Sequence, residues 1–233
     1  MKVKVCVPVP AEKFSDIFTM ISQAERHGAD IIEVRLDYLG SSIMDYIDRL
    51  GEIVEFSKTP LIATNRLVEQ GGRSPLDEER RLETLVSAAR AGFKYVDVEL
   101  STRGLNRVID AIKAYGAKVI VSYHNFRCTP QLQEMEEIVN SQIEAGADVC
   151  KVVTMANSIT DSVNCLIFTY EMSRKTNIVC FAMGEKGLLS RVLSPLFGAQ
   201  FTYASLEKSL ETAPGQITVE EIKEIYGRLG VWR

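Results

Sequence analysis

Lys151 occupies an unusual position, in the middle of a run of β-branched and apolar residues that reads Asp148-Val149-Cys150-Lys151-Val152-Val153-Thr154. Such a run is typical of a strand that is covered on both faces. Burial disfavours the charged ammonium and favours the neutral amine, which can attack a carbonyl group. Two ordinary alternatives are a lysine at a strand edge that extends to solvent and a lysine paired with a carboxylate.

Polar residues recur two positions apart in other β-rich runs. Side chains at i and i+2 of a strand share a face, so each such set is predicted to lie on one side of its strand. The sets are Glu33, Arg35 and Asp37; Thr64 and Arg66; Asp97 and Glu99; and Ser122 and His124. Because an unpaired buried charge is strongly destabilising, this pattern predicts paired charges around a ligand site.

Two histidines and one arginine are further candidates. His124 ends a β-rich run, where an imidazole can act as a proton shuttle or simply bond to a loop carbonyl. His27 precedes a glycine in the last turn of an expected helix, where a cation suits the helix dipole, so we expect a structural role. Arg191 lies just inside a helix, and its guanidinium suits a carboxylate or phosphate; a surface arginine is the alternative.

The elements that must position these side chains alternate regularly along the chain. Strands are expected at residues 2–9, 30–37, 60–66, 95–100, 117–124, 148–154, 178–183 and 201–205. Helices are expected at 12–27, 42–57, 76–91, 103–115, 130–145, 158–175, 187–197 and 218–229. Eight strand–helix units in one chain predict a single-domain (β/α)8 barrel over residues 1–233, with its chemistry at the C-terminal ends of the strands.

Glycines at the joints support this reading. Gly28, Gly92, Gly116 and Gly146 each stand between an expected helix and the next strand, where a left-handed C′ residue is common. A doubly wound open sheet is the competing fold. It is disfavoured because the first strand is followed by no G-x-G-x-x-G motif.

Composition excludes several classes of function. A formal net charge of −4 gives no basic surface for nucleic acid. No run of 18 apolar residues and no signal peptide are found, so we expect no membrane association. The 5 cysteines lack a C-x-x-C pair, which indicates reduced thiols in a cytoplasmic protein. With 2 histidines that are far apart, no metal site is expected.

Taken together, seven stretches resemble the type I 3-dehydroquinate dehydratases of the shikimate pathway. They are Glu33-Val34-Arg35-Leu36-Asp37, Thr64-Asn65-Arg66, Gln70-Gly71-Gly72, Ser122-Tyr123-His124-Asn125-Phe126, Lys151-Val152-Val153, Met183-Gly184 through Ser190-Arg191, and Ala213-Pro214-Gly215-Gln216. They span nearly the whole chain in the family's order. Each is weak alone, and seven in register are a specific signal.

The resemblance implies a (β/α)8 barrel that converts 3-dehydroquinate into 3-dehydroshikimate without a metal or organic cofactor. Lys151 would form a Schiff base with the substrate ketone, and His124 would be the general base and acid. Arg191 would hold the substrate carboxylate. The remaining substrate-binding positions implied are Glu33, Arg35, Arg66, Thr212 and Gln216.

Two positions depart from the family pattern. Gln70 stands where the family usually has a glutamate near the catalytic histidine, which leaves Gln70 or the neighbouring Glu69 to take its place. Thr212 stands where a serine is usual, so the hydroxyl is retained. The loop that contains Pro214 and Gly215 is the substrate lid in this family.

Two other functions are compatible with parts of the pattern. A class I aldolase or transaldolase also carries a Schiff-base lysine on the sixth strand, but it would more often show a phosphate site after strands seven and eight. A non-catalytic barrel that senses a small acid could keep Arg191 but has no use for a buried Lys151. We expect a homodimer; residues 192–197 could supply an apolar interface, although core packing is the more common role of such a segment.

Overall fold

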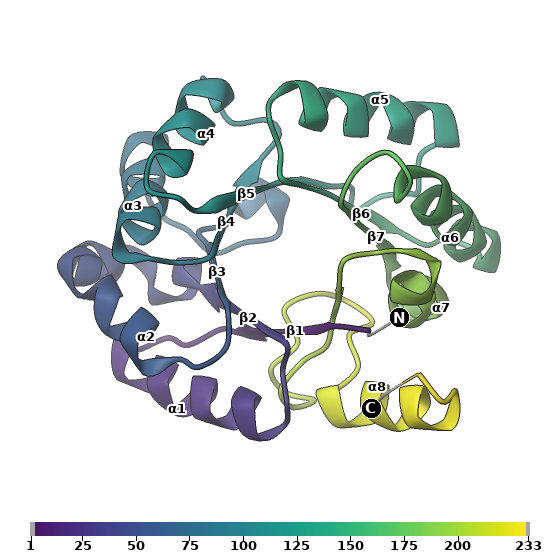
Figure 1. The fold of residues 1–233 in the computed structure, drawn as a ribbon, viewed down its shortest axis with the longest axis horizontal. Helices are drawn as coiled ribbons and strands as arrows, with labels where there is room; N and C mark the ends of the chain where they lie inside the picture. Colours follow the sequence, from purple (N-terminus) through teal and green to yellow (C-terminus); the bar gives the residue numbers. More distant parts are fainter. Residues whose placement is uncertain (1–2, 232–233) are drawn as a thin grey trace.

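Figure 1 shows a ring of strands surrounded by helices in the computed structural model, which describes residues 3–231. The strands are β1 (Val5–Val9), β2 (Ile31–Arg35), β3 (Leu61–Thr64), β4 (Tyr95–Glu99), β5 (Lys118–His124), β6 (Val149–Met155), β7 (Ile178–Met183) and β8 (Thr202–Tyr203). The helices are α1 (Phe14–Arg26), α2 (Leu50–Phe56), α3 (Glu78–Ala91), α4 (Leu105–Lys113), α5 (Leu132–Glu144), α6 (Ile159–Met172), α7 (Leu188–Leu193) and α8 (Val219–Arg228). The 3-10 segments are η1 (Leu36–Arg49), which is divided at Gly40, and the shorter η2 (Val68–Gln70), η3 (Glu185–Gly187) and η4 (Ser194–Phe197).

The strands form one parallel sheet that curves into a nearly closed barrel. Each strand pairs with the next from β1 to β7, and β8 pairs with β1. Between the two remaining edges, the N–H of Gln200 donates to the carbonyl of Ile178 at 2.8 Å. The predicted (β/α)8 barrel is therefore confirmed.

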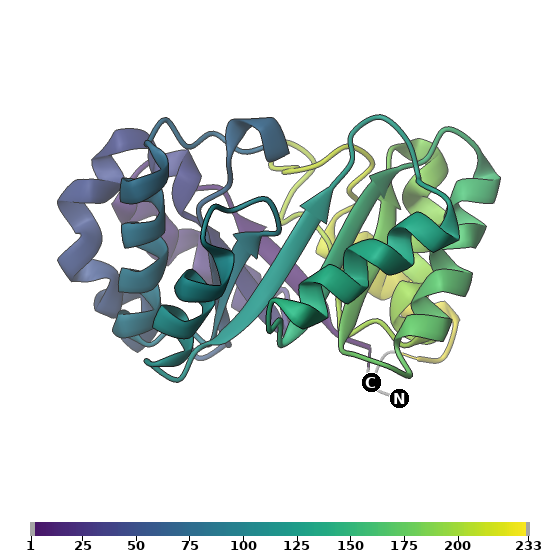
Figure 2. The ribbon, with the colours of Figure 1, turned by 90° about the horizontal axis from the view of Figure 1, so that it is seen from above.

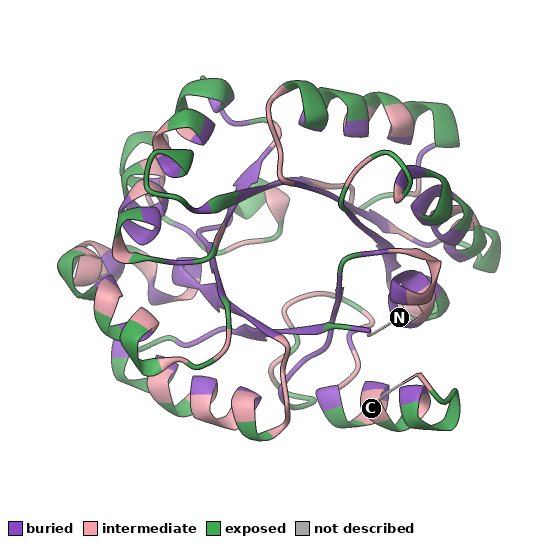
Figure 3. Ribbon diagram, viewed as in Figure 1, coloured by how far each residue is buried: buried purple, intermediate pink, exposed green. Residues whose placement is uncertain are grey.

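Apolar burial explains why the chain adopts this arrangement. The strands are buried on both faces, and each helix turns its apolar side inward, as the purple inner and green outer surfaces in Figure 3 show. Side chains such as Ile17 and Ile21 of α1 pack on the outside of the barrel, whereas Ile62 and Val179 fill its interior. The four predicted joint glycines all adopt positive φ angles, as expected for left-handed C′ positions.

Three elements differ from the predicted ones. The helix expected at residues 42–57 is α-helical only over α2, because the preceding residues up to Arg49 belong to the 3-10 segment η1. That segment bends before the expected helix, at Gly40, whose φ of 62° and ψ of −142° are not helical. The helix expected at 187–197 divides into α7 and η4, since Pro195 lacks the N–H that an α-helix needs. Strand β8 is only 2 residues long, and Lys2 of the first predicted strand lies outside the described residues.

The C-terminal ends of the strands meet at one end of the barrel. Figure 2 shows the arrowheads of β5 and β7 pointing to the upper edge, where the loops after β3 and β8 also lie. This end carries the longest connections and is the place where a barrel of this type holds its site. Among residues 3–231, no helix combines the length and apolar character needed to cross a membrane.

Candidate active site

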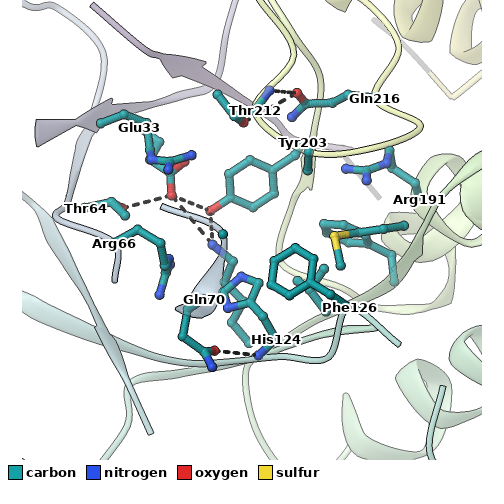
Figure 4. A pocket seen from close by; sticks show the side chains of 17 residues that line it. Glu33, Thr64, Arg66, Gln70, His124, Phe126, Arg191, Tyr203, Thr212 and Gln216 are labelled. Atoms are coloured by element: carbon teal, nitrogen blue, oxygen red, sulfur yellow. Dashed lines mark hydrogen bonds and ion pairs between the residues drawn. The ribbon is translucent and has the colours of Figure 1, made fainter. Parts of the chain in front are cut away.

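A cavity of about 480 Å³, part of it open to solvent, occupies this end of the barrel. It is lined by Glu33, Arg35, Thr64, Arg66, Gln70, Gly71, His124, Phe126, Lys151, Val153, Phe181, Met183, Arg191, Tyr203, Thr212, Ala213 and Gln216. All eight residues that the sequence predicts for the site are in this set. Figure 4 shows their side chains converging from opposite walls of the barrel.

Lys151 lies on β6 at the bottom of the cavity, 4% exposed. Its Nζ donates to Oδ2 of Asp97 and to the hydroxyl of Tyr203, both at 2.9 Å, and lies 3.6 Å from Oε1 of Glu33. The alternative of a lysine that extends to solvent is wrong. The alternative of pairing with carboxylates is correct, and it holds together with burial, because Lys151 lies beside both Asp97 and Glu33.

Asp97 is held in place by further polar contacts besides the one with Lys151. The guanidinium of Arg66 lies 2.9 Å from Oδ2 of Asp97, and the Ser122 hydroxyl donates to Oδ1 at 2.6 Å. Burial opposes ionisation of Asp97, but the positive charges of Arg66 and Lys151 outweigh it and lower the pKa of this carboxyl. Asp97 therefore stays ionised and serves as the counter-ion of Lys151 and Arg66 rather than as a proton acceptor.

Glu99 connects the cavity wall to a helix. It accepts hydrogen bonds from Arg81 of α3 at 2.7 Å and from the backbone N–H of Leu67 at 3.1 Å. It also lies 3.1 Å from Nη1 of Arg66. Since all these ionic groups are buried, the network holds Arg66 and the start of the following loop in one geometry.

His124 ends β5 beside the cavity mouth. Its backbone N–H donates to Oε1 of Gln70 at 3.2 Å, and its buried Nδ1 has no hydrogen-bond partner in the described chain. Burial, followed by the positive charges of Arg66 and Lys151, lowers the pKa of His124 well below its usual value. The imidazole is therefore neutral near pH 7 and able to accept a proton. Gln70 lines the cavity, whereas Glu69 is exposed, so Gln70 occupies the loop position beside the histidine.

The buried guanidinium of Arg191 has hydrogen-bond donors that the protein does not use. It is 1% exposed, and burial lowers its pKa to about 10. Nη2 donates to the carbonyl of Pro214 at 3.2 Å, while Nε and Nη1 have no partner within residues 3–231. The guanidinium lies 4.4 Å from the ring centroid of Phe181. A buried cation with two unused donors suits an anionic ligand.

The loop after β8 closes one side of the cavity. Thr212 donates its backbone N–H to Oε1 of Gln216 at 2.8 Å, and Gly184 donates its N–H to the carbonyl of Pro214 at 3.1 Å. Gly215 has a φ of +70°, and a Cβ there would meet the carbonyl oxygen of Gly184 at 2.4 Å. The loop is thus seated on the end of β7, which only glycine at position 215 permits.

Arg35 and His27 each lie close to a carboxylate of the protein itself. Arg35 forms a two-pronged pair with Asp37, at 2.9 and 2.7 Å, so its guanidinium is already compensated. His27 caps the C-terminus of α1, and its Nδ1 lies 3.1 Å from Oε1 of Glu220, away from the cavity residues. Its expected position at a helix end is confirmed.

Sequence reasoning missed several residues of the cavity wall. Tyr203 is the most important, because its hydroxyl contacts both Lys151 and Glu33. Phe181 and Met183 form the apolar wall on β7. A signal was available for Tyr203, since it stands two positions after Phe201 in an expected strand, and both side chains are buried in the barrel interior.

Comparisons of the sequence with known proteins all indicate the same family. The family model for type I 3-dehydroquinase matches residues 5–231. A 3-dehydroquinate dehydratase of Dehalococcoides mccartyi is 38% identical over 214 residues, covering 90% of this chain and 92% of that protein. One from Methanosarcina acetivorans is 40% identical over 209 residues, covering 87% and 86%. These matches favour a dehydratase over the aldolase and sensor alternatives.

Solved structures agree with the sequence comparison. The 3-dehydroquinate dehydratase of Geobacillus kaustophilus superposes with a TM-score of 0.91 at 25% identity, covering 100% of this chain and 93% of that one. The type I enzyme of Clostridium difficile superposes with a TM-score of 0.89 at 26% identity, covering 98% and 92%. The chain therefore belongs to the type I 3-dehydroquinase family and is a hydro-lyase, an enzyme of dehydration in the shikimate pathway.

Proposed function

We propose that the enzyme dehydrates 3-dehydroquinate through a Schiff base on Lys151, with His124 as general base and acid. One observation carries the proposal: the same cavity contains a buried lysine and a buried arginine that has unused hydrogen-bond donors. The substrate offers a ketone for the first and a carboxylate for the second. The solved Clostridium difficile relative carries covalently modified comenic acid, which supports covalent chemistry in this family.

Lys151 supplies the electron sink. Its neutral amine adds to the ketone carbon, and loss of the resulting hydroxyl as water leaves a cationic iminium. The positive charge acidifies the C–H bond next to the iminium carbon. When that proton leaves, the electron pair moves into an enamine, which then expels the hydroxyl group from the neighbouring carbon.

His124 moves the protons. As a neutral imidazole it takes the proton from the carbon, and as an imidazolium it gives a proton to the departing hydroxyl, which leaves as water. The lowered pKa of His124 suits the first step, since the base form is present in the resting enzyme. Water then hydrolyses the cationic iminium, releasing 3-dehydroshikimate and leaving Lys151 as its ammonium, so that the positive charge is retained on Nζ.

The remaining cavity residues orient the substrate. We assign the carboxylate to Arg191, because a carboxylate would satisfy its unused Nε and Nη1 donors. Glu33, Arg35, Arg66, Thr212 and Gln216 then hold the ring hydroxyls and the carboxylate from the surrounding wall. Closure of the site by the loop after β8 would limit access of water to the covalent intermediate.

Borohydride trapping tests the covalent step directly. The enzyme is mixed with 3-dehydroquinate, reduced with sodium borohydride and analysed by intact-mass and peptide mass spectrometry. We expect a stable adduct on the peptide that contains Lys151, no adduct in Lys151→Ala, and an unchanged adduct in Lys186→Ala, which removes an exposed lysine after β7. Dehydration that continues without any adduct would rule out the Schiff base.

We also propose a cytoplasmic homodimer. Four of the free cysteines are buried thiols, which suits a reducing compartment. Val192 and Pro195 pack inward, so the segment at 192–197 is part of the core. The outer face of α6 instead exposes Ile159, Val163, Ile167 and Tyr170, and a dimer would cover such a stripe. Sedimentation of the enzyme and of Ile167→Glu tests this, since a monomer in both cases would refute it.

A further inference from the structure

The phenol of Tyr203 lies between the proposed nucleophile and a carboxylate. Nζ of Lys151 donates to the Tyr203 hydroxyl at 2.9 Å, and that hydroxyl donates to Oε1 of Glu33 at 3.2 Å. Figure 4 shows the dashed contacts meeting at the phenol oxygen. All three side chains are buried. Two consecutive hydrogen bonds therefore lead from the amine to a carboxylate.

A route for a proton is needed at this place. The ammonium of Lys151 must lose a proton before it can attack a ketone. Asp97 is the carboxylate nearest to Nζ, but it also pairs with Arg66 and accepts from Ser122. Because these contacts stabilise its ionised form, Asp97 is a poor acceptor for that proton.

Glu33 is held by weaker partners. Its Oε1 accepts hydrogen bonds from the hydroxyls of Thr64, at 2.9 Å, and Tyr203. Within residues 3–231 its ion pair is with Lys151, at 3.6 Å, and none with an arginine is found. The charges of Arg35 and Arg66 also act on Glu33, but its hydrogen-bonding partners are neutral hydroxyls, so the path from Lys151 to Oε1 runs through the hydroxyl of Tyr203.

We propose that Tyr203 is a further catalytic residue, whose hydroxyl carries a proton between Lys151 and Glu33 during formation and hydrolysis of the imine. The proposal rests on the Schiff base assigned above. A proton passes from Nζ to the phenol oxygen while the phenol proton passes to Oε1, which leaves a neutral amine, an intact phenol and a protonated Glu33. After the amine has added to the ketone, the stored proton returns and leaves with the hydroxyl of the addition intermediate as water. Formation of the iminium then involves no net gain or loss of protons.

The surroundings favour this use of the phenol. Burial, followed by the negative charge of Glu33, raises the pKa of Tyr203, so the hydroxyl keeps its proton and can both donate and accept. The other charged or titratable groups near the relay include Cys6 of β1, Arg35 of β2, Arg66 after β3, Asp97 of β4 and His124 of β5.

Tyr203→Phe tests the relay because it removes only the hydroxyl. Rapid mixing with 3-dehydroquinate, followed by borohydride quenching at a series of times, gives the rate of adduct formation on Lys151. We expect a fall of roughly 10²-fold, the lower end of what a positioned acid–base group contributes, with product affinity unchanged. Tyr226→Phe is the matched control, since its buried phenol donates to the Val192 carbonyl at 2.6 Å outside the cavity and should not affect the rate.

Two further readouts separate a relay from a packing effect. The deficit of Tyr203→Phe should shrink as pH rises, because hydroxide then removes the proton that the relay carries, whereas a packing defect would persist at every pH. Glu33→Gln interrupts the same path from the other end, and combining it with Tyr203→Phe should be no slower than the slower single variant. Adduct formation at the wild-type rate in Tyr203→Phe would overturn the relay alone. Absence of any Lys151 adduct in the wild-type enzyme would overturn the Schiff base and the relay together.

Discussion

Replacing Arg191 by methionine should stabilise the ligand-free enzyme while it weakens ligand binding. Burial lowers the pKa of Arg191 from the ordinary value of 12.5 to about 10. At about 1.4 kcal/mol for each pKa unit, this corresponds to roughly 3 kcal/mol of unfavourable free energy in the folded state. Methionine removes the charge and keeps much of the contact with Phe181, but it loses the hydrogen bond to Pro214, which contributes about 1 kcal/mol.

The net change is a gain of about 2 kcal/mol in the free energy of unfolding, or roughly 4–8 °C in Tm for a chain of this size. The assay is urea and thermal unfolding without ligand, beside the Kd for the product and the kcat/KM. We expect affinity to fall by about 2–5 kcal/mol, the usual loss when one partner of a buried charged pair is removed.

Arg81 provides a matched control. It is 0% exposed, but it is fully paired, with Glu99 at 2.7 Å and Glu78 at 3.0 Å. Arg81→Met should therefore destabilise the protein by roughly 3–5 kcal/mol, because Glu99 loses a buried partner. If both variants are destabilised alike and Arg191→Met binds product normally, the assignment of Arg191 as the carboxylate clamp is refuted.

Four further predictions concern the chemistry of the cavity. Lys151→Ala and Lys151→Arg should both abolish turnover, since a guanidinium cannot form the imine; measurable kcat in either would contradict the covalent mechanism. His124→Ala should lower kcat by roughly 10² to 10⁴ and accumulate the borohydride-reducible adduct, and an unchanged kcat would remove His124 from the mechanism. Because its pKa is lowered, His124 stays in its base form as pH falls below its usual titration range, so the acid limb of kcat/KM should lie below about pH 6.5. Gln70→Glu places a carboxylate where the side chain of residue 70 contacts the backbone N–H of His124, and its negative charge should move that limb to higher pH. A limb that does not move would show that residue 70 does not influence the titration of His124.

Regular alternation let the sequence predict most of the fold. Strand and helix periods, together with glycines such as Gly92 and Gly146 at the joints, indicate eight strand–helix units, and eight units of this length close into a barrel. The period of 2 in strands also predicts which polar residues share a face, and Glu33, Arg35, Arg66 and His124 from these sets do line the cavity. Thr212 and Gln216 lie in a loop, and only the family resemblance pointed to them. Two local exceptions were missed, because the pattern does not distinguish the 3-10 turns of η1 from an α-helix and because the division at Pro195 depends on a single residue inside an otherwise helical pattern.

The contacts that set the chemistry were decided by the tertiary structure. Asp97 and Tyr203 are 54 and 52 residues from Lys151 in the sequence, and they meet its Nζ only because the strands of a closed barrel bring their inward faces together. Sequence periodicity assigns a face to a residue, but it contains no information on which partner across the barrel that residue will reach. The unused donors of Arg191 and the path from Lys151 through Tyr203 therefore follow from register and closure, which determine how far the opposite walls of the barrel lie apart.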